Sequence, residues 1–275
     1  MARAIDGAGV TEIDGRVRGD DSMFDGRRGV PASGYSVSRW VGPLSALSLN
    51  HGLAWPVARG FQSQPPLFAA RRLQLRLERA GVDIARGARM GRAPENAAPL
   101  ATIASRPLAS LVRHMAQVSD NFYAETLIKG LGARFGGAGS TAAGASVVQA
   151  VARGLGAGAR VVDGSGLSRA NAIAPAAVGR LLQSARSQTW FDSFYRALPL
   201  AGRTGTLANR MRHTAAKGRC RAKTGTLIAV SALAGYCRSR SNRTFAFALL
   251  MNGVNVTAAR AIQDRIASAL AAYRG

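Results

Sequence analysis

Apolar residues recur three to four positions apart in several stretches of the chain, a spacing typical of amphipathic helices. The first such helix is expected to begin at Pro65 and to end near Gly81. Further helices are predicted at residues 108–118, 121–135, 145–155 and 175–182. A last helix is expected to start at a capping Thr257, with an apolar stripe formed by Ile262, Ile266, Leu270 and Tyr273.

Alternating or continuous apolar runs predict strands elsewhere. Phe245, Phe247 and Leu249 alternate along residues 244–251, and an apolar run covers residues 230–237. Shorter strands are expected at 82–84, at 160–163 and within 40–48, whereas the Gly- and Asp-rich residues 1–35 predict turns and short strands. Residues 154–159 match a dinucleotide-binding fingerprint, but they follow a predicted helix and precede a strand. We therefore interpret them as the end of that helix.

Composition limits the classes of protein that the chain can be. It has 275 residues and is 47% hydrophobic, which is enough for a substantial core. No apolar run reaches the roughly 18 residues of a membrane helix, and no export signal is visible at residues 1–7. We therefore expect no membrane span.

The net charge of +23 is unevenly distributed, because residues 1–25 carry six acidic residues and only three arginines. The strongly basic remainder favours polyanionic surroundings, such as nucleic acid, anionic lipid or an acidic cell wall. A genome whose codon usage is biased toward Arg, Ala and Gly would explain the same charge. The arginines are scattered and only 6% of residues are aromatic, which does not fit a groove that stacks single-stranded bases.

Two short boxes carry the candidate chemistry. Lysine is rare in this chain, with 3 lysines against 34 arginines, yet Lys223 stands in a Lys-Thr-Gly-Thr box. Unlike arginine, a buried lysine can lose its proton. Thr224 and Thr226 add hydroxyl groups, and Gly225 leaves room for a ligand or another backbone to approach. The second box, Ser119-Asp120-Asn121, lies upstream between two predicted helices.

Four blocks together resemble a known family. They cover residues 119–125, 163–169, 202–211 and 222–236, in this order. On these residues the chain resembles the D-alanyl-D-alanine carboxypeptidase/endopeptidase family, the class C low-molecular-mass penicillin-binding proteins. The resemblance implies an α+β fold with an antiparallel sheet flanked by helices, a β-lactamase/transpeptidase-like domain incomplete at its N-terminus. Residues 1–45 would be the tail of a β-rich inserted domain, and 46–275 the transpeptidase-like domain.

The resemblance also implies roles, partners and a location. Ser119 would relay a proton to the leaving D-alanine nitrogen, Asn121 would bind the substrate's side amide, and Lys223 would hold the electrostatics of the relay. Thr224, Gly225 and Thr226 would form the substrate-binding strand, with both hydroxyls on the terminal carboxylate and the Thr226 N–H in the oxyanion hole. Expected ligands are peptidoglycan peptides ending in D-Ala-D-Ala and β-lactams, outside the cytoplasm. Neither nucleic acid, nor a cofactor, nor a metal is expected, and Asp120 is expected to face solvent.

The chain departs from this family at the nucleophile, which belongs to a Ser-x-x-Lys box. No such box exists here, because the residues three positions before Lys129, Lys217 and Lys223 are Thr126, Thr214 and Cys220. We interpret the chain as the carboxy-terminal part of the enzyme, and we expect Lys129 to serve a helix core. Alternative hypotheses are a non-catalytic remnant that binds peptidoglycan or β-lactams, and a basic nucleic-acid-binding protein.

The two cysteines are predicted to face each other across a hairpin. A two-residue turn at Ile228-Ala229 pairs Leu227 with Val230, and the same register puts Cys220 opposite Cys237. At a non-hydrogen-bonded pair the Cβ atoms come close enough for a disulfide. Two small buried hydrophobic residues are the alternative. We favour a disulfide because the resembling family works outside the cytoplasm.

Overall fold

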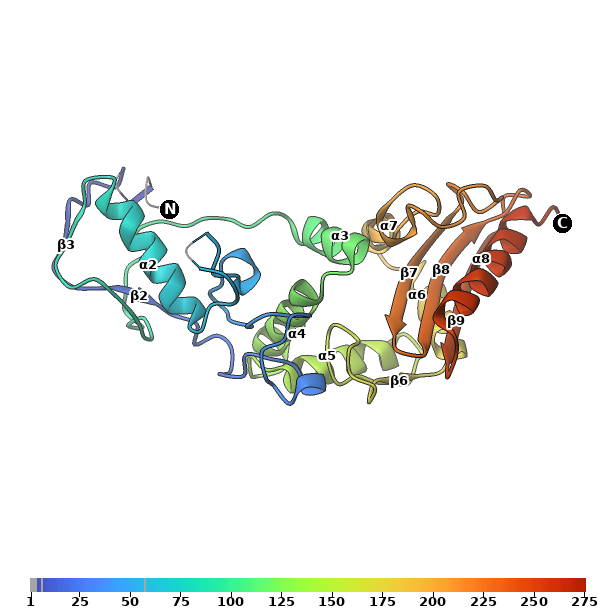
Figure 1. Ribbon diagram of the computed structural model, residues 1–275, viewed down its shortest axis with the longest axis horizontal. Helices are drawn as coiled ribbons and strands as arrows, with labels where there is room; N and C mark the ends of the chain where they lie inside the picture. The colour runs from blue at the N-terminus through green and yellow to red at the C-terminus, as the bar shows by residue number, and fades with distance from the viewer. Residues whose placement is uncertain (1–3, 6, 57) are drawn as a thin grey trace. The chain divides into compact units, whose positions relative to one another are not determined.

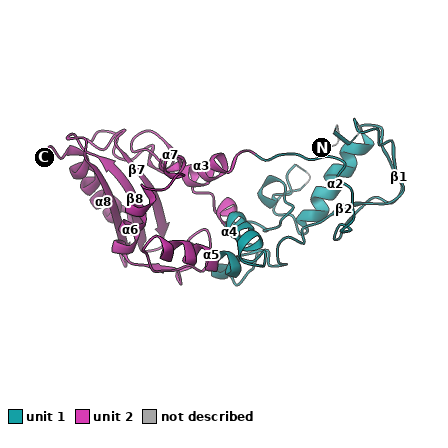
Figure 2. Ribbon diagram, turned by 180° about the vertical axis from the view of Figure 1, so that it is seen from behind, with its two compact units in different colours: residues 1–105, 125–144 teal, residues 106–124, 145–275 magenta. Residues whose placement is uncertain are grey.

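A computed structural model describes residues 4–275 except 6 and 57. The chain divides into two compact units, coloured separately in Figure 2. The first unit comprises Met1–Ser105 and Glu125–Gly144, and the second comprises Arg106–Ala124 and Ala145–Gly275. The domain boundary expected between residues 45 and 46 lies inside the first unit.

In the first unit, the described residues up to 105 form one main helix and two pairs of short parallel strands (Figure 1), and most of α4 (Asn121–Phe135) belongs to the same unit. β1 (Glu12–Ile13) pairs with β3 (Asp83–Ile84), and β2 (Val17–Gly19) pairs with β4 (Ala88–Met90). The predicted helix is α2 (Pro65–Glu78), which packs on β2 and β4. Its core contains Val17, Ala70, Leu77 and Val82. Two 3-10 turns, η1 (Pro31–Ser33) and η2 (Asn50–Gly52), lie between β2 and α2.

The prediction of a strand within residues 40–48 was wrong. These residues form turns and bends, although 41–45 are buried. Gly42 adopts a φ of 83°, which breaks an extended run, and Pro43 has no N–H for a strand ladder. Burial without a sheet partner explains why the apolar pattern was misleading.

Lys129 is a buried member of α4 (Asn121–Phe135), with 1% of its surface exposed. Its ammonium pairs with the Asp25 carboxylate and donates a hydrogen bond of 2.8 Å to the Arg27 carbonyl. The Asp25 N–H donates in turn to Gly139 O at 2.9 Å. All four residues belong to the first unit, and Lys129 therefore fixes the segment around Asp25 to α4. Its burial agrees with the expected role in a helix core.

The second unit contains a three-stranded antiparallel sheet in the order β7-β8-β9. Its strands are β7 (Cys220–Leu227), β8 (Val230–Arg238) and β9 (Thr244–Asn252). The predicted hairpin register is confirmed, with Leu227 opposite Val230 and Cys220 opposite Cys237.

A disulfide bond joins Cys220 to Cys237, whose Cα atoms are 4.0 Å apart. The neighbouring Arg238 N–H donates to Arg219 O at 3.0 Å. Because hydrogen-bonded and non-hydrogen-bonded pairs alternate along an antiparallel ladder, the cysteines occupy the closer, non-hydrogen-bonded kind of site.

Helix α8 (Val256–Ala272) covers the face of the sheet on which the disulfide lies. Its buried residues are Ala259, Gln263, Ala267 and Ala271. Of the predicted stripe, Leu270 packs against the core whereas Ile262 and Tyr273 are exposed, so that prediction was only partly correct. The Sγ atoms of both cysteines approach Ala267 O at 3.6 and 3.7 Å, a closeness that only a small side chain allows. The helix is capped by Asn255, which accepts the Ala258 N–H, and not by Thr257.

The opposite face of the sheet packs on aromatic residues. Tyr236 is fully buried, and its hydroxyl donates to Leu182 O at 2.6 Å. Leu182 lies on α6 (Pro175–Ala185), while Phe191 and Tyr195 lie on α7 (Phe191–Ala197), a helix that the sequence pattern did not predict. Burial raises the pKa of Tyr236 to about 12.

The remaining elements of the chain are short or connect the main ones. They are α3 (Leu108–Val118), α5 (Thr141–Gly154), β5 (Ala159–Arg160) paired with β6 (Ala172–Ile173), and the 3-10 turn η3 (Gly205–Leu207). The glycine-rich residues 154–159 do end a helix and lead into a strand, so they do not form a dinucleotide-binding loop. Among the described residues, no helix combines the length and hydropathy that a bilayer crossing requires.

Candidate functional site

Ser119 lies at the corner between α3 and α4. It caps the end of α3 with left-handed backbone angles (φ 57°, ψ 53°), and its N–H donates to Met115 O. A residue with a Cβ adopts this conformation at a cost, and such residues concentrate at functional sites. The sharp corner ends α3 at Val118.

Lys223 brings its ammonium group to this hydroxyl from the middle of β7. Its Nζ donates to Ser119 Oγ at 2.7 Å and to Thr224 O at 2.8 Å. Burial lowers the pKa of Lys223 below its ordinary value, because desolvation disfavours the charged form. Since Oγ accepts from the lysine, the hydroxyl proton of Ser119 is available to another acceptor.

The two threonines of the box are held by different neighbours. Thr224 Oγ1 donates to Thr206 Oγ1 at 2.9 Å. Thr206 belongs to η3, which packs against the end of α3 through Gly205. Gly205 has a φ of 56°, and a Cβ there would lie 2.5 Å from Gln117 O, so only glycine fits. The turn therefore places a third hydroxyl beside the box.

Arg260 places a second cation at the far end of the box. Its Nη2 donates to Thr226 Oγ1 at 3.0 Å from the first turns of α8. Helix N-termini favour anions, as does a guanidinium. Two cations and three hydroxyls, contributed by β7, α8 and η3, form a site that suits a carboxylate.

Asp120 does not face solvent, and that expectation was wrong. Its side chain is only 14% exposed. Oδ1 accepts the Tyr123 N–H at 3.0 Å, which caps α4, and Oδ2 lies 3.4 Å from His114 Nε2. Aspartate is among the best N-cap residues, and this local role explains the result. Asn121 occupies the first position of α4, two residues after Ser119.

The block 163–169 supports the turn of the hairpin. Asp163 is 4% exposed, and its carboxylate accepts hydrogen bonds from the N–H groups of Gly166 and Ser168 at 2.9 and 2.6 Å. Ser165 and Ser168 each accept a backbone N–H two residues ahead, as turn formers do. Arg169 Nη2 donates to Ile228 O at 2.6 Å, which links this loop to the β7–β8 turn.

The sequence pattern identified the two boxes but not Thr206 and Arg260, which hold the threonines of the Lys-Thr-Gly-Thr box. Thr206 lies inside a block that resembled the family, but no role followed from the pattern. Arg260 carried no signal, because it is one arginine among 34 and reaches Thr226 only once α8 has packed on the sheet.

Comparisons of sequence agree with the resemblance. The sequence model of the D-Ala-D-Ala carboxypeptidase 3 (S13) family matches residues 55–273. A D-alanyl-D-alanine carboxypeptidase of an Actinomadura species is 39% identical over 223 residues, covering 77% of this chain and 41% of the relative. Carboxypeptidase DacB of Mycolicibacterium smegmatis is 32% identical over 270 residues, covering 93% and 57%. The chain thus spans about half the length of these curated relatives.

Solved structures show the same fold. Penicillin-binding protein 4 (dacB) from Haemophilus influenzae matches with a TM-score of 0.80 at 20% identity, over 98% of this chain and 78% of that one. A second structure of that protein, complexed with a novel β-lactam, matches with a TM-score of 0.66 at 25% identity, over 78% and 52%. The α+β fold expected from the sequence is confirmed.

Proposed function

This chain belongs to the D-Ala-D-Ala carboxypeptidase 3 (S13) family, and on that premise we propose that Ser119 and Lys223 serve a serine-type D-Ala-D-Ala carboxypeptidase/endopeptidase. The substrates are peptidoglycan stem peptides, and the site works outside the cytoplasm. The contact between Lys223 Nζ and Ser119 Oγ carries the proposal, since it joins the two boxes at 2.7 Å.

The reaction proceeds through an acyl-enzyme. A serine hydroxyl attacks the carbonyl carbon of the penultimate D-alanine, the C–N bond breaks, and water later hydrolyses the ester. In the first step Ser119 acts as a proton relay: its hydroxyl proton passes to the leaving amine nitrogen, and the proton lost by the attacking serine replaces it. The ammonium of Lys223 supports that transfer through its hydrogen bond to Oγ.

Substrate binding uses the rest of the box. Thr224 and Thr226 hold the terminal carboxylate, and the Thr226 N–H supplies half of the oxyanion hole. Arg260 adds a positive charge at the Thr226 end, and Asn121 binds the side amide of the peptide. β-Lactams are ligands because they present a carboxylate and a reactive amide in the same arrangement.

The attacking serine is assigned to a segment outside residues 1–275, because these residues contain no Ser-x-x-Lys. The 275-residue chain alone is therefore expected to bind a D-Ala-D-Ala peptide without hydrolysing it. Loss of a nucleophile and its base costs on the order of a million-fold in turnover in a well-studied serine protease.

Two measurements test this function. NMR titration of the chain with a D-Ala-D-Ala peptide should saturate, and Lys223→Ala should abolish the shifts while Lys217→Ala leaves them unchanged. Mass spectrometry after incubation with labelled penicillin should find no covalent adduct. An adduct on any serine of this chain would refute the assignment of the nucleophile, and absence of peptide binding would refute the site.

The second candidate is a non-catalytic remnant that binds peptidoglycan or β-lactams, and the missing Ser-x-x-Lys box favours it. The DNA upstream of the Met1 codon separates the two functions. An in-frame Ser-x-x-Lys there, preceded by an export signal, supports the enzyme. Stop codons in that region support the remnant.

A further inference from the structure

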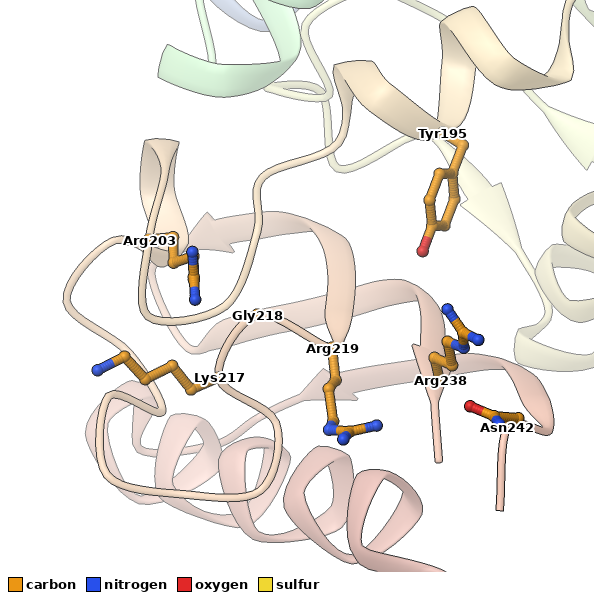
Figure 3. A pocket seen from close by; sticks show the side chains of 7 residues that line it. All are labelled: Tyr195, Arg203, Lys217, Gly218, Arg219, Arg238 and Asn242. Carbon is orange, nitrogen blue, oxygen red and sulfur yellow. The ribbon is translucent and has the colours of Figure 1, made fainter. Parts of the chain in front are cut away.

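A basic cavity of about 490 Å³ opens in the second unit at the start of β7 (Figure 3). Its lining contains no carboxylate and none of the residues that surround Ser119 and Lys223. The lining residues are Tyr195, Arg203, Lys217, Gly218, Arg219, Arg238 and Asn242.

Arg219 and Arg238 face each other across the first hydrogen-bonded step of the hairpin. The Arg238 N–H donates to Arg219 O at 3.0 Å, so the two residues are direct cross-strand neighbours. Like charges directly opposite each other destabilise a sheet. Within the described part of the chain, neither arginine forms an ion pair with a carboxylate. An external anion would relieve this repulsion.

The walls of the cavity are held by contacts outside it. Arg219 Nη1 donates to Ser239 O at 3.2 Å. The ring of Tyr195 packs 5.7 Å from that of Tyr236, and its hydroxyl is directed toward Arg238 in Figure 3. Gly218 has a φ of 70°, and a Cβ there would lie 3.0 Å from Arg203 Nε. The Arg219 guanidinium is thus held by a hydrogen bond before a ligand binds, which lowers the entropy that this side chain loses on binding.

We propose that this cavity binds a small ligand carrying a phosphate or diphosphate group. The guanidinium groups of Arg203, Arg219 and Arg238 suit phosphate oxygens, which they bind in pairs. Several positive charges favour a multiply charged anion over a single carboxylate. The Tyr195 hydroxyl and the Asn242 amide supply neutral donors, and the volume lies in the range of small-molecule sites. This open hollow, lined by exposed arginines, is more local than the diffuse basic surface that a nucleic-acid duplex would use.

Lys217 provides a matched control. It lines the same cavity and carries the same charge, but Figure 3 shows its ammonium directed away from Arg219 and Arg238. Removing its charge lowers the general field of the protein as much as removing Arg238 does. The difference between the two variants therefore measures specific contacts.

The test is calorimetric titration of the full 275-residue chain with pyrophosphate at low ionic strength. We expect saturable binding at one site, weakened about tenfold or more by Arg238→Gln or Arg203→Gln and less than about twofold by Lys217→Gln. Without ligand, Arg238→Gln should raise the melting temperature, because the repulsion with Arg219 is removed, and this also shows that the variant folds.

Three results would overturn the proposal. They are titration without saturation, equal weakening by Lys217→Gln and Arg238→Gln, and tighter binding of duplex DNA with equal losses in all three variants. Peptide binding at Lys223 is independent of each of these outcomes, so failure here leaves the proposed function standing.

Discussion

Ser119 and Lys223 are 104 residues apart in the chain, and their side chains meet at 2.7 Å. In a protein that joins this chain to a Ser-x-x-Lys segment, Lys223→Ala should slow acylation by a β-lactam roughly a hundredfold or more, because the proton relay loses its charged partner. Stopped-flow fluorescence with a labelled penicillin measures that rate.

Asp120→Ala is the natural comparison, since Asp120 caps α4 beside the same site. It should lower the free energy of unfolding by about 1 kcal/mol and leave the acylation rate within a few-fold of the parent. Asp120→Asn should restore most of that stability, because asparagine caps equally well. Equal losses of acylation rate from Lys223→Ala and Asp120→Ala would contradict the assigned roles.

Arg260→Gln should weaken binding of a peptide with a free terminal carboxylate by about tenfold, because a charge-assisted contact is lost. A peptide whose terminus is amidated should bind parent and variant alike. NMR titration of the parent 275-residue chain and of the variant, each with both peptides, gives the four dissociation constants to compare. Equal weakening for both peptides would mean that Arg260 merely positions Thr226.

The disulfide between Cys220 and Cys237 should leave no thiol to alkylate in protein that is unfolded without reductant. The double variant Cys220→Ala/Cys237→Ala should lose about 3 kcal/mol of unfolding free energy, as expected for a closed loop of this size. Urea denaturation of the variant, beside reduced and oxidised parent protein, gives the comparison. Two alkylated thiols in the oxidised parent would disprove the bridge.

Tyr236→Phe should change how stability depends on alkaline pH. The folded-state pKa of Tyr236 is about 12, against an ordinary 10.0, so the folded protein keeps a proton that the unfolded chain releases. Tyr236 costs no stability well below pH 10, and between pH 10 and pH 12 it lowers the free energy of unfolding by roughly 2 kcal/mol.

The phenylalanine variant lacks this loss, although it is about 1 kcal/mol less stable at pH 7 without the bond to Leu182 O. Urea unfolding of both proteins at pH 7, 10 and 11.5 gives the difference between their free energies of unfolding at each pH. Other titrating groups contribute equally to both proteins and so cancel in that difference. Parallel stability curves over this range would contradict the raised pKa.

The strongly periodic parts of the fold were predictable because local pattern and packing agree there. Helices α2, α3 and α4 begin within a residue of their expected positions. The β7–β8 register followed from one two-residue turn, since a one-residue slip would move every side chain of the strand to the other face. The two boxes of the site were likewise visible, because each is a contiguous motif.

The missed features depend on contacts between distant segments. The buried face of α8 is formed by alanines and Gln263, because the disulfide and Ser231 require a close approach. A hydrophobicity pattern ranks isoleucine above alanine and so selects a partly wrong stripe. Arg260 and Thr206 were missed for a similar reason, since their partners Thr226 and Thr224 lie 34 and 18 residues away.

The pairing of Lys129 with Asp25 has a consequence for anyone who dissects this protein into fragments. A polypeptide that starts at residue 46 would keep the buried ammonium and discard its counter-ion. An uncompensated charge in that position typically costs 3–5 kcal/mol, roughly the margin by which a small folded unit persists at all. A stable fragment that contains α4 must therefore include Asp25, so its first residue lies no later than position 25 and cannot be chosen from the loops that follow.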